Sequence, residues 1–246
     1  MNFIIIPLVL GWLSGWLVNY LADVLPVTRS FSRPICPHCE TPYRLGGYLL
    51  FHNCRTCGTP RQWRPLVIQA VLTVVPILLW VFPRPGFPFV LAFSLFIFLS
   101  LVFVIDLEHR LILHPVSLFG ALLALGIGIY LHGVVTTLIG GAVGFGIMLV
   151  FYFIGELYVR YMSRKRGITT DEVALGFGDV NLSGILGLLL GWPTISAGLL
   201  FAVLAGGLIS LFIILGMLIA KKYKAFTAIP YAPFLILSAL YLLYIL

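Results

Sequence analysis

Two aspartates stand at the ends of long apolar runs, where a charged carboxylate is costly. Asp179 follows Gly176-Phe177-Gly178 and precedes the apolar run Val180 to Trp192, and Asp106 ends the run Phe87 to Ile105. An acidic side chain at membrane depth is a functional-site hypothesis by default. Two carboxylates that meet share one proton and titrate as a unit, which is the electronic requirement of an aspartic protease. We therefore predict Asp106 and Asp179 as a catalytic pair.

A structural alternative stays open at this point. Each aspartate could cap a helix or pair with a nearby arginine, such as Arg110 for Asp106. Asn19 and Asp23, near the end of the first apolar segment, reach the same membrane edge in the predicted topology. Spacing alone does not decide between chemistry and capping.

The four cysteines of the chain form two C-x2-C pairs, Cys36 with Cys39 and Cys54 with Cys57, separated by fourteen residues. Four thiolates at this spacing suit a tetrahedral zinc ion. Such a site is structural, because four protein ligands leave no position for water. Disulfides or free thiols are the alternatives, and a cytoplasmic location disfavours disulfides.

The composition requires a membrane to shield these elements. Hydrophobic residues make up 61% of the 246 residues and charged residues 9%, with a mean hydropathy of +1.11. Backbone groups in lipid must be satisfied internally, which selects helices. We predict an all-α, polytopic membrane protein with about eight transmembrane helices near Phe3 to Leu25, Leu66 to Phe82, Phe87 to Ile105, Leu111 to Leu131, Val134 to Leu157, Leu175 to Gly191, Ile195 to Ala220 and Pro230 to Leu246.

Three parts follow from these spans: a first transmembrane helix at 1–25, a zinc-binding loop at 26–65 and a transmembrane core at 66–246. Eight spans put fourteen of the fifteen lysines and arginines, including those of Lys221 to Lys224, on one face, and only Arg84 on the other. The positive-inside rule makes the rich face cytoplasmic, and this face carries the zinc loop and both aspartates. Basic residues scattered over four loops without a motif do not indicate nucleic-acid binding.

Five features in order resemble the bacterial prepilin peptidases, or type IV leader peptidases. They cover essentially the whole chain: Gly15-Trp-Leu-Val-Asn19 with Pro26, the double C-x2-C loop, Ile105-Asp106-Leu107-Glu108 leading to Pro115, Gly176-Phe177-Gly178-Asp179-Val180, and Ile229-Pro230-Tyr231-Ala232-Pro233-Phe234-Leu235. The tetrapeptide G-x-G-D alone is a weak signal, and the ordered set is a strong one.

The resemblance implies an intramembrane aspartic protease of the G-x-G-D class in the bacterial inner membrane, with Asp106 and Asp179 as its catalytic residues. Glu108 occupies a family position that is not catalytic. The family removes basic leader peptides from type IV prepilins and type II secretion pseudopilins on the cytoplasmic side. Many members then methylate the new amino terminus with S-adenosylmethionine.

The sequence also departs from the family pattern. Gln69 stands where the family usually has an acidic residue that has been linked to methylation, so that activity is in doubt here. Other departures are Val24, Val116, Asn181 and Ala232. None removes either aspartate, and together they indicate a divergent member.

Two functions of other classes remain as alternatives. A proton- or cation-coupled transporter could use the same carboxylates, although both lie at one membrane edge and transporter sites usually lie near the midplane. A non-catalytic assembly protein could use the zinc loop to bind a partner. His114 and His132 are single residues, which we expect to be satisfied or exposed.

Overall fold

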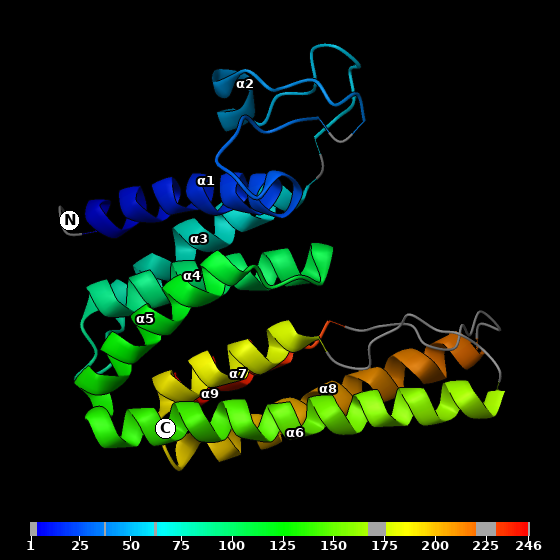
Figure 1. The fold of residues 1–246 in the computed structure, drawn as a ribbon. Coiled ribbons are helices and arrows are strands. Elements are labelled where there is room, and N and C mark those ends of the chain that lie inside the picture. Colours follow the sequence, from blue (N-terminus) through cyan, green and yellow to red (C-terminus); the bar gives the residue numbers. More distant parts are fainter. Residues whose placement is uncertain (1–3, 37, 62, 167–175, 220–229, 246) are drawn as a thin grey trace. The chain divides into compact units, whose positions relative to one another are not determined.

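The computed structural model of the chain is built from helices (Figure 1). It describes residues 4–36, 38–61, 63–166, 176–219 and 230–245. The chain divides into two compact units, Met1–Ile105 and Asp106–Leu246, and each is described by itself. The three-part division at residues 25 and 65 stays a prediction.

The first unit contains a helix pair and the cysteine loop. Helices α1 (Ile5–Thr28) and α3 (Arg64–Val81) pack together, the short helix α2 (Leu45–Leu49) lies in the loop between them, and α4 (Phe89–His109) follows. Glycines allow α1 and α3 to approach closely, since a Cβ atom on Gly11 would stand 2.5 Å from the Leu72 carbonyl oxygen.

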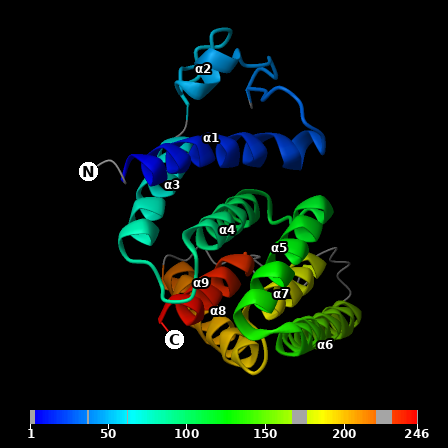
Figure 2. The same cartoon turned by 90° about the vertical axis from the view of Figure 1, so that its left-hand side faces the viewer.

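The second unit is a bundle arranged around one short helix. It contains α5 (His114–His132), α6 (Val134–Arg166), α7 (Phe177–Leu190), α8 (Thr194–Ile219) and α9 (Ala232–Ile245). Helix α7 packs against α5, α6, α8 and α9, as Figures 1 and 2 both show. Its 14 residues extend about 21 Å, less than the roughly 30 Å of a hydrocarbon core. Protein therefore surrounds most of α7, and ten of its residues are buried.

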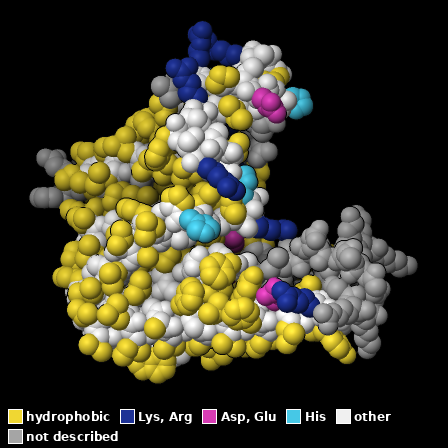
Figure 3. Space-filling view, in the orientation of Figure 1, with side chains coloured by type: hydrophobic (Ala, Val, Ile, Leu, Met, Phe, Trp, Pro, Cys, Tyr) yellow, Lys and Arg dark blue, Asp and Glu magenta, His cyan; other side chains and the backbone are white. Residues whose placement is uncertain are grey.

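Each of the eight predicted apolar segments forms a helix. Six helices are long and apolar enough to cross a membrane, α1, α3, α4, α5, α6 and α8, while α7 and α9 are shorter apolar helices. Large hydrophobic side chains remain exposed along these helices, as expected of lipid-facing surfaces. Figure 3 shows them covering the flank of α5 and α6, with an acidic and a basic side chain on the carboxyl-terminal part of α6. The membrane protein of the all-α class is confirmed.

The helix boundaries differ from the predicted ones by a few residues, except in α6. This helix continues to Arg166, nine residues beyond the expected end at Leu157, because a helix can leave the apolar layer without breaking. The expected boundaries at Phe3, Leu175, Ala220 and Leu246 lie outside the described residues. So does the basic cluster Lys221 to Lys224.

Candidate active site and metal centre

Asp179 lies in the first turn of α7 and is only 8% exposed. Gly176, the N-cap residue immediately before this helix, has an extended backbone. Its N–H group donates a hydrogen bond to the Asp179 carboxylate. The Asp179 N–H group in turn donates to the Gly176 carbonyl at 3.0 Å. The motif thus forms a compact turn that fixes the carboxylate at the positive end of a helix.

Asp106 lies in the last turns of α4 and is 5% exposed. Its carboxylate accepts a hydrogen bond from the N–H group of Ala232, the first residue of α9. The Oδ2 atom of Asp106 is buried and has no hydrogen-bond partner in the part of the chain that the structure describes. One carboxylate oxygen is therefore held by the protein, while the other is left for a further group.

The second unit brings these two aspartates together. The Asp106 carboxylate is near enough to Asp179 to act on it electrostatically. The expectation that two acids 73 positions apart meet in the fold agrees with this arrangement. Both alternatives for the aspartates also hold in part, because Asp179 caps α7 and Arg110 acts electrostatically on Asp106.

Tyr231, immediately before α9, completes the surroundings of the pair. It interacts electrostatically with Asp179, and its buried hydroxyl group has no hydrogen-bond partner within residues 4–36, 38–61, 63–166, 176–219 and 230–245. The neighbouring residue Ile229 of the sequence motif lies outside the described residues. The motif at the start of α9 therefore contributes a backbone donor to Asp106 and a phenol near Asp179.

The other polar residues expected at this membrane edge belong to the first unit. The Asn19 side chain donates to the Pro65 carbonyl at 3.1 Å, which joins α1 to α3. Asp23 accepts hydrogen bonds from Tyr48 and Arg61 and is also ion-paired with Arg64. Both residues are engaged in structure within that unit.

The four cysteines form a cluster whose geometry fits a metal ion. Their sulfur atoms all lie within 4.8 Å of one another. The Sγ atoms of Cys36 and Cys57 are 3.7 Å apart, and those of Cys39 and Cys54 are 3.6 Å apart. A tetrahedral zinc site with Zn–S bonds of about 2.3 Å has sulfur atoms about 3.8 Å apart. All four thiols are free of disulfides.

The two C-x2-C pairs adopt the same turn. In the first, Cys36 N–H donates to the Thr41 carbonyl at 2.9 Å and Glu40 N–H donates to the Cys36 carbonyl at 2.9 Å. In the second, Cys54 N–H donates to the Thr59 carbonyl at 3.1 Å, and Gly58 N–H donates to the Cys54 carbonyl at 2.9 Å. Glu40 and Gly58 both have a left-handed backbone, with φ of 55° and 68°.

Backbone groups in these turns favour the thiolate form that a metal needs. The N–H groups of Cys57 and Thr56 lower the pKa of the Cys54 thiol to about 6, although desolvation acts in the opposite direction. The N–H groups of His38 and Cys39 lower the pKa of Cys36 in the same way. The donor set thus combines tetrahedral spacing with two stabilised thiolates, those of Cys36 and Cys54.

Arg61 attaches the cysteine loop to α1. Its guanidinium lies 3.9 Å from the centre of the Tyr48 ring and donates to Asp23 at 3.2 Å. The Tyr48 hydroxyl group donates to the same carboxylate at 2.5 Å. Burial and the Asp23 charge raise the pKa of Tyr48 above its ordinary range, so this phenol remains a donor. An arginine between an aromatic ring and a carboxylate thus positions the loop.

Comparison with known proteins agrees with this site. Residues 93–211, which contain both aspartates, match the model of the type IV leader peptidase family. A prepilin leader peptidase/N-methyltransferase of Legionella pneumophila is 30% identical over 221 residues, covering 85% of this chain and 70% of that protein. The chain belongs to the type IV leader peptidase family.

Further leader peptidases support the assignment. A prepilin leader peptidase/N-methyltransferase of Aeromonas hydrophila is 24% identical over 223 residues, covering 88% of this chain and 72% of that protein. A prepilin leader peptidase/N-methyltransferase of Myxococcus xanthus is 29% identical over 227 residues, covering 87% of this chain and 64% of that protein. No solved structure matches the chain.

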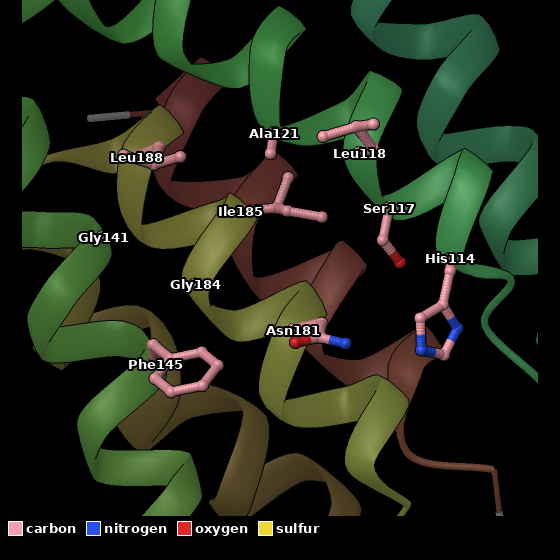
Figure 4. Close-up of a pocket in the computed structure, with 10 residues that line it drawn as sticks. All are labelled: His114, Ser117, Leu118, Ala121, Gly141, Phe145, Asn181, Gly184, Ile185 and Leu188. Carbon is pink, nitrogen blue, oxygen red and sulfur yellow. The ribbon is translucent and has the colours of Figure 1, made fainter.

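This leader peptidase also contains a cavity that sequence reasoning missed. It lies between α5, α6 and α7 and has a volume of about 410 Å³. Figure 4 shows His114 and Ser117 of α5 and Asn181 of α7 grouped at one end of it. His114 is exposed, as expected, and the sequence marks Asn181 only as a departure from the family pattern. Residues of three helices line this cavity. The feature of the sequence that could have indicated it is the spacing of apolar residues along α7.

Proposed function

We propose that this leader peptidase is an intramembrane aspartic endopeptidase that removes the leader peptide of type IV prepilins or type II secretion pseudopilins. The observation that carries this proposal is the pair of buried, electrostatically coupled carboxylates Asp106 and Asp179. Neighbouring carboxylates cannot both ionise at low cost, so the pair retains one proton. A retained proton gives the site one acid and one base.

The two carboxylates divide the hydrolysis between them. The ionised carboxylate takes a proton from water as the water oxygen attacks the scissile carbonyl carbon, and the protonated one donates its proton to the carbonyl oxygen. Collapse of the tetrahedral intermediate breaks the C–N bond and re-forms the carbonyl group, as one hydroxyl proton of the intermediate passes to the ionised carboxylate. The departing amine takes up the proton of the other carboxyl group, so the pair again holds one proton. The free Oδ2 atom of Asp106 supports a direct contact with water or substrate.

The location follows from charge and from the form of the substrate. We place the chain in the bacterial inner membrane, with the cysteine loop and the aspartates on the cytoplasmic side. The substrate helix then lies in the bilayer while its basic leader stays in the cytoplasm. Cys36, Cys39, Cys54 and Cys57 would hold a structural zinc ion, which supplies folding energy to the loop and takes no part in hydrolysis.

Methylation by S-adenosylmethionine is not required by this proposal. The amide of Gln69 donates to the Trp12 carbonyl at 2.7 Å, so position 69 holds a neutral donor inside the α1 and α3 contact. No carboxylate is available there. The product therefore needs a direct test: mass spectrometry of the cleaved pilin shows an unmodified or a methylated amino terminus.

The deciding experiment uses purified full-length protein in detergent with a prepilin substrate. Asp106→Asn and Asp179→Asn should each abolish cleavage, because an amide cannot exchange the shared proton. Glu156→Gln is the matched control, since Glu156 is an acid on α6 that is ion-paired with Arg160 at 2.5 Å. This control should cleave at the wild-type rate. Cleavage that persists in Asp179→Asn would reject the proposed chemistry.

A further inference from the structure

A groove runs along one face of α7, between α5 and α6. From α7 it is lined by Asn181, Gly184, Ile185 and Leu188, with Phe177 one turn before them. These positions follow the i, i+4, i+7, i+8, i+11 spacing of a single helix face. The distance from Asn181 to Leu188 is about 10 Å, or two helical turns. The groove therefore matches a segment of helix in length.

The groove is polar at one end and apolar along the rest. His114, Ser117 and Asn181 form the polar end, near the first turns of α5 and α7 (Figure 4). The Ser117 hydroxyl group is buried and has no hydrogen-bond partner among the described residues. Leucine, isoleucine, alanine, glycine and phenylalanine residues line the remainder. All three polar residues can donate hydrogen bonds, and none of the described residues that line the groove is acidic.

This chemistry is complementary to one kind of occupant. An apolar helix fits the long apolar part, and a hydrogen-bond acceptor on that helix, such as a carboxylate or a free backbone carbonyl, fits the three donors. The polar end lies on the same turn of α7 that carries Asp179. The groove therefore ends at the level of Asp179 along α7.

We propose that this groove holds the apolar helix of the prepilin substrate and that Asn181, His114 and Ser117 bind an acceptor near the amino-terminal end of that helix. The inference rests on the proposed function, because it assigns a place to the substrate of that reaction. It also fixes the direction of the substrate, whose leader must extend from the polar end towards Asp179.

The geometry of α7 adds a constraint on the scissile segment. Asp179 is two residues from both Phe177 and Asn181, so it projects from the opposite side of the helix. A substrate helix in the groove cannot pass Asp179 directly. Its amino-terminal segment must leave helical form and cross the exposed start of α7 at Gly176 and Phe177. Crossing a helix about 10 Å wide takes about three or four extended residues.

Photocrosslinking tests the site without altering the groove. Single benzophenone amino acids are placed along the apolar segment of the prepilin and bound to the Asp179→Asn protein. Probes about four residues or more after the scissile bond should crosslink to α5, α6 and α7 near Leu118, Ala121 or Phe145. Crosslinks confined to the exposed faces of α8, or to lipid, would overturn the inference.

A matched pair of variants tests the consequence for binding. Ala121→Phe fills the groove from its rim, whereas Leu122→Phe places the same ring on the exposed neighbouring position of α5, outside the groove. We expect Ala121→Phe to raise KM about tenfold with kcat nearly unchanged, because it removes substrate binding and leaves the acids in place. Leu122→Phe should leave both constants near wild type.

The failures of the two proposals are distinguishable. Equal KM values for Ala121→Phe and Leu122→Phe, with wild type active and Asp179→Asn inactive, would reject the groove and retain the protease. A lipid occupant would give this same result. Cleavage by Asp179→Asn would reject the protease itself, whatever the crosslinks show.

Discussion

Gly178 packs so closely on Ile112 that a Cβ atom at position 178 would stand 2.9 Å from the Ile112 Cβ atom. Ile112 lies between α4 and α5, six residues after Asp106. The contact sets the first turn of α7 against the chain that leaves α4. Gly178, the second glycine of the G-x-G-D motif, therefore allows the turn that carries Asp179 to lie close to the chain that follows Asp106.

Gly178→Ala should lower kcat/KM by about 10- to 100-fold, because a displacement near 1 Å is enough to misalign catalytic groups. Gly176→Ala is the control in the same motif. Its Cβ atom would stand 3.5 Å from the Asp179 Oδ2 atom and 4.0 Å from the Gly178 nitrogen, which are ordinary contacts, so activity should stay within about threefold of wild type. Ile112→Gly in the Gly178→Ala background should restore part of the activity. Equal losses in both alanine variants would contradict this explanation.

The sequence was sufficient to predict the helices, because the apolar runs are long and are separated by charged residues, prolines or, between α5 and α6, a glycine. It also placed Asp106 and Asp179 at one membrane edge, since Asp106 ends a run that leads to that edge and Asp179 begins a run that leads away from it. It did not show why Gly178 is required. That reason depends on Ile112, 66 positions away, and no local pattern encodes the distance between them.

After its second cysteine, the first cysteine turn has Glu40 and the second has Gly58, and both residues have positive φ. Left-handed backbone costs a side-chain-bearing residue roughly 1–2 kcal/mol relative to glycine. Glu40→Gly should therefore stabilise the metal-loaded loop by about 1 kcal/mol, and Gly58→Ala should destabilise it by a similar amount. The concentration of chelator that removes half of the zinc measures both changes. A metal analysis that finds no zinc in the wild-type protein would contradict the premise.

Gln69 packs against Gly15, whose Cβ atom would stand 2.6 Å from the Gln69 Oε1 atom. Gln69→Glu replaces the donor to the Trp12 carbonyl with a carboxylate, which repels that oxygen in a buried contact. We expect the variant to lose about 1–3 kcal/mol of stability. Thermal unfolding in detergent at neutral pH measures the loss, and lowering the pH should reduce it, because the protonated acid can donate again. Full stability of Gln69→Glu at neutral pH would show that the amide is not needed.

The sequence predicts those site residues that stand in a local motif, and it does not predict contacts between distant segments. Asp106, Asp179 and the cysteines stand in recognisable local patterns. The groove does not, because His114 and Ser117 come from α5, Phe145 from α6 and Asn181 from α7. Arg61 and Asp23 likewise meet across 38 positions without any periodic signal.

Glycines join α6 to α7 and thereby hold the helix that carries Asp179. A Cβ atom on Gly140 would stand 2.4 Å from the Gly187 carbonyl oxygen, whereas one on Gly146 of the same helix would meet nothing within 4 Å. Gly140→Ala must therefore separate the two backbones, and we expect it to cost about 1–3 kcal/mol. Gly146→Ala should be neutral or stabilising by up to about 1 kcal/mol, because alanine is the better helix former. Denaturant titration in detergent compares the two, and cleavage assays should show a loss only for Gly140→Ala. The same stability in both variants would mean that the α6 and α7 contact is looser than their glycines indicate.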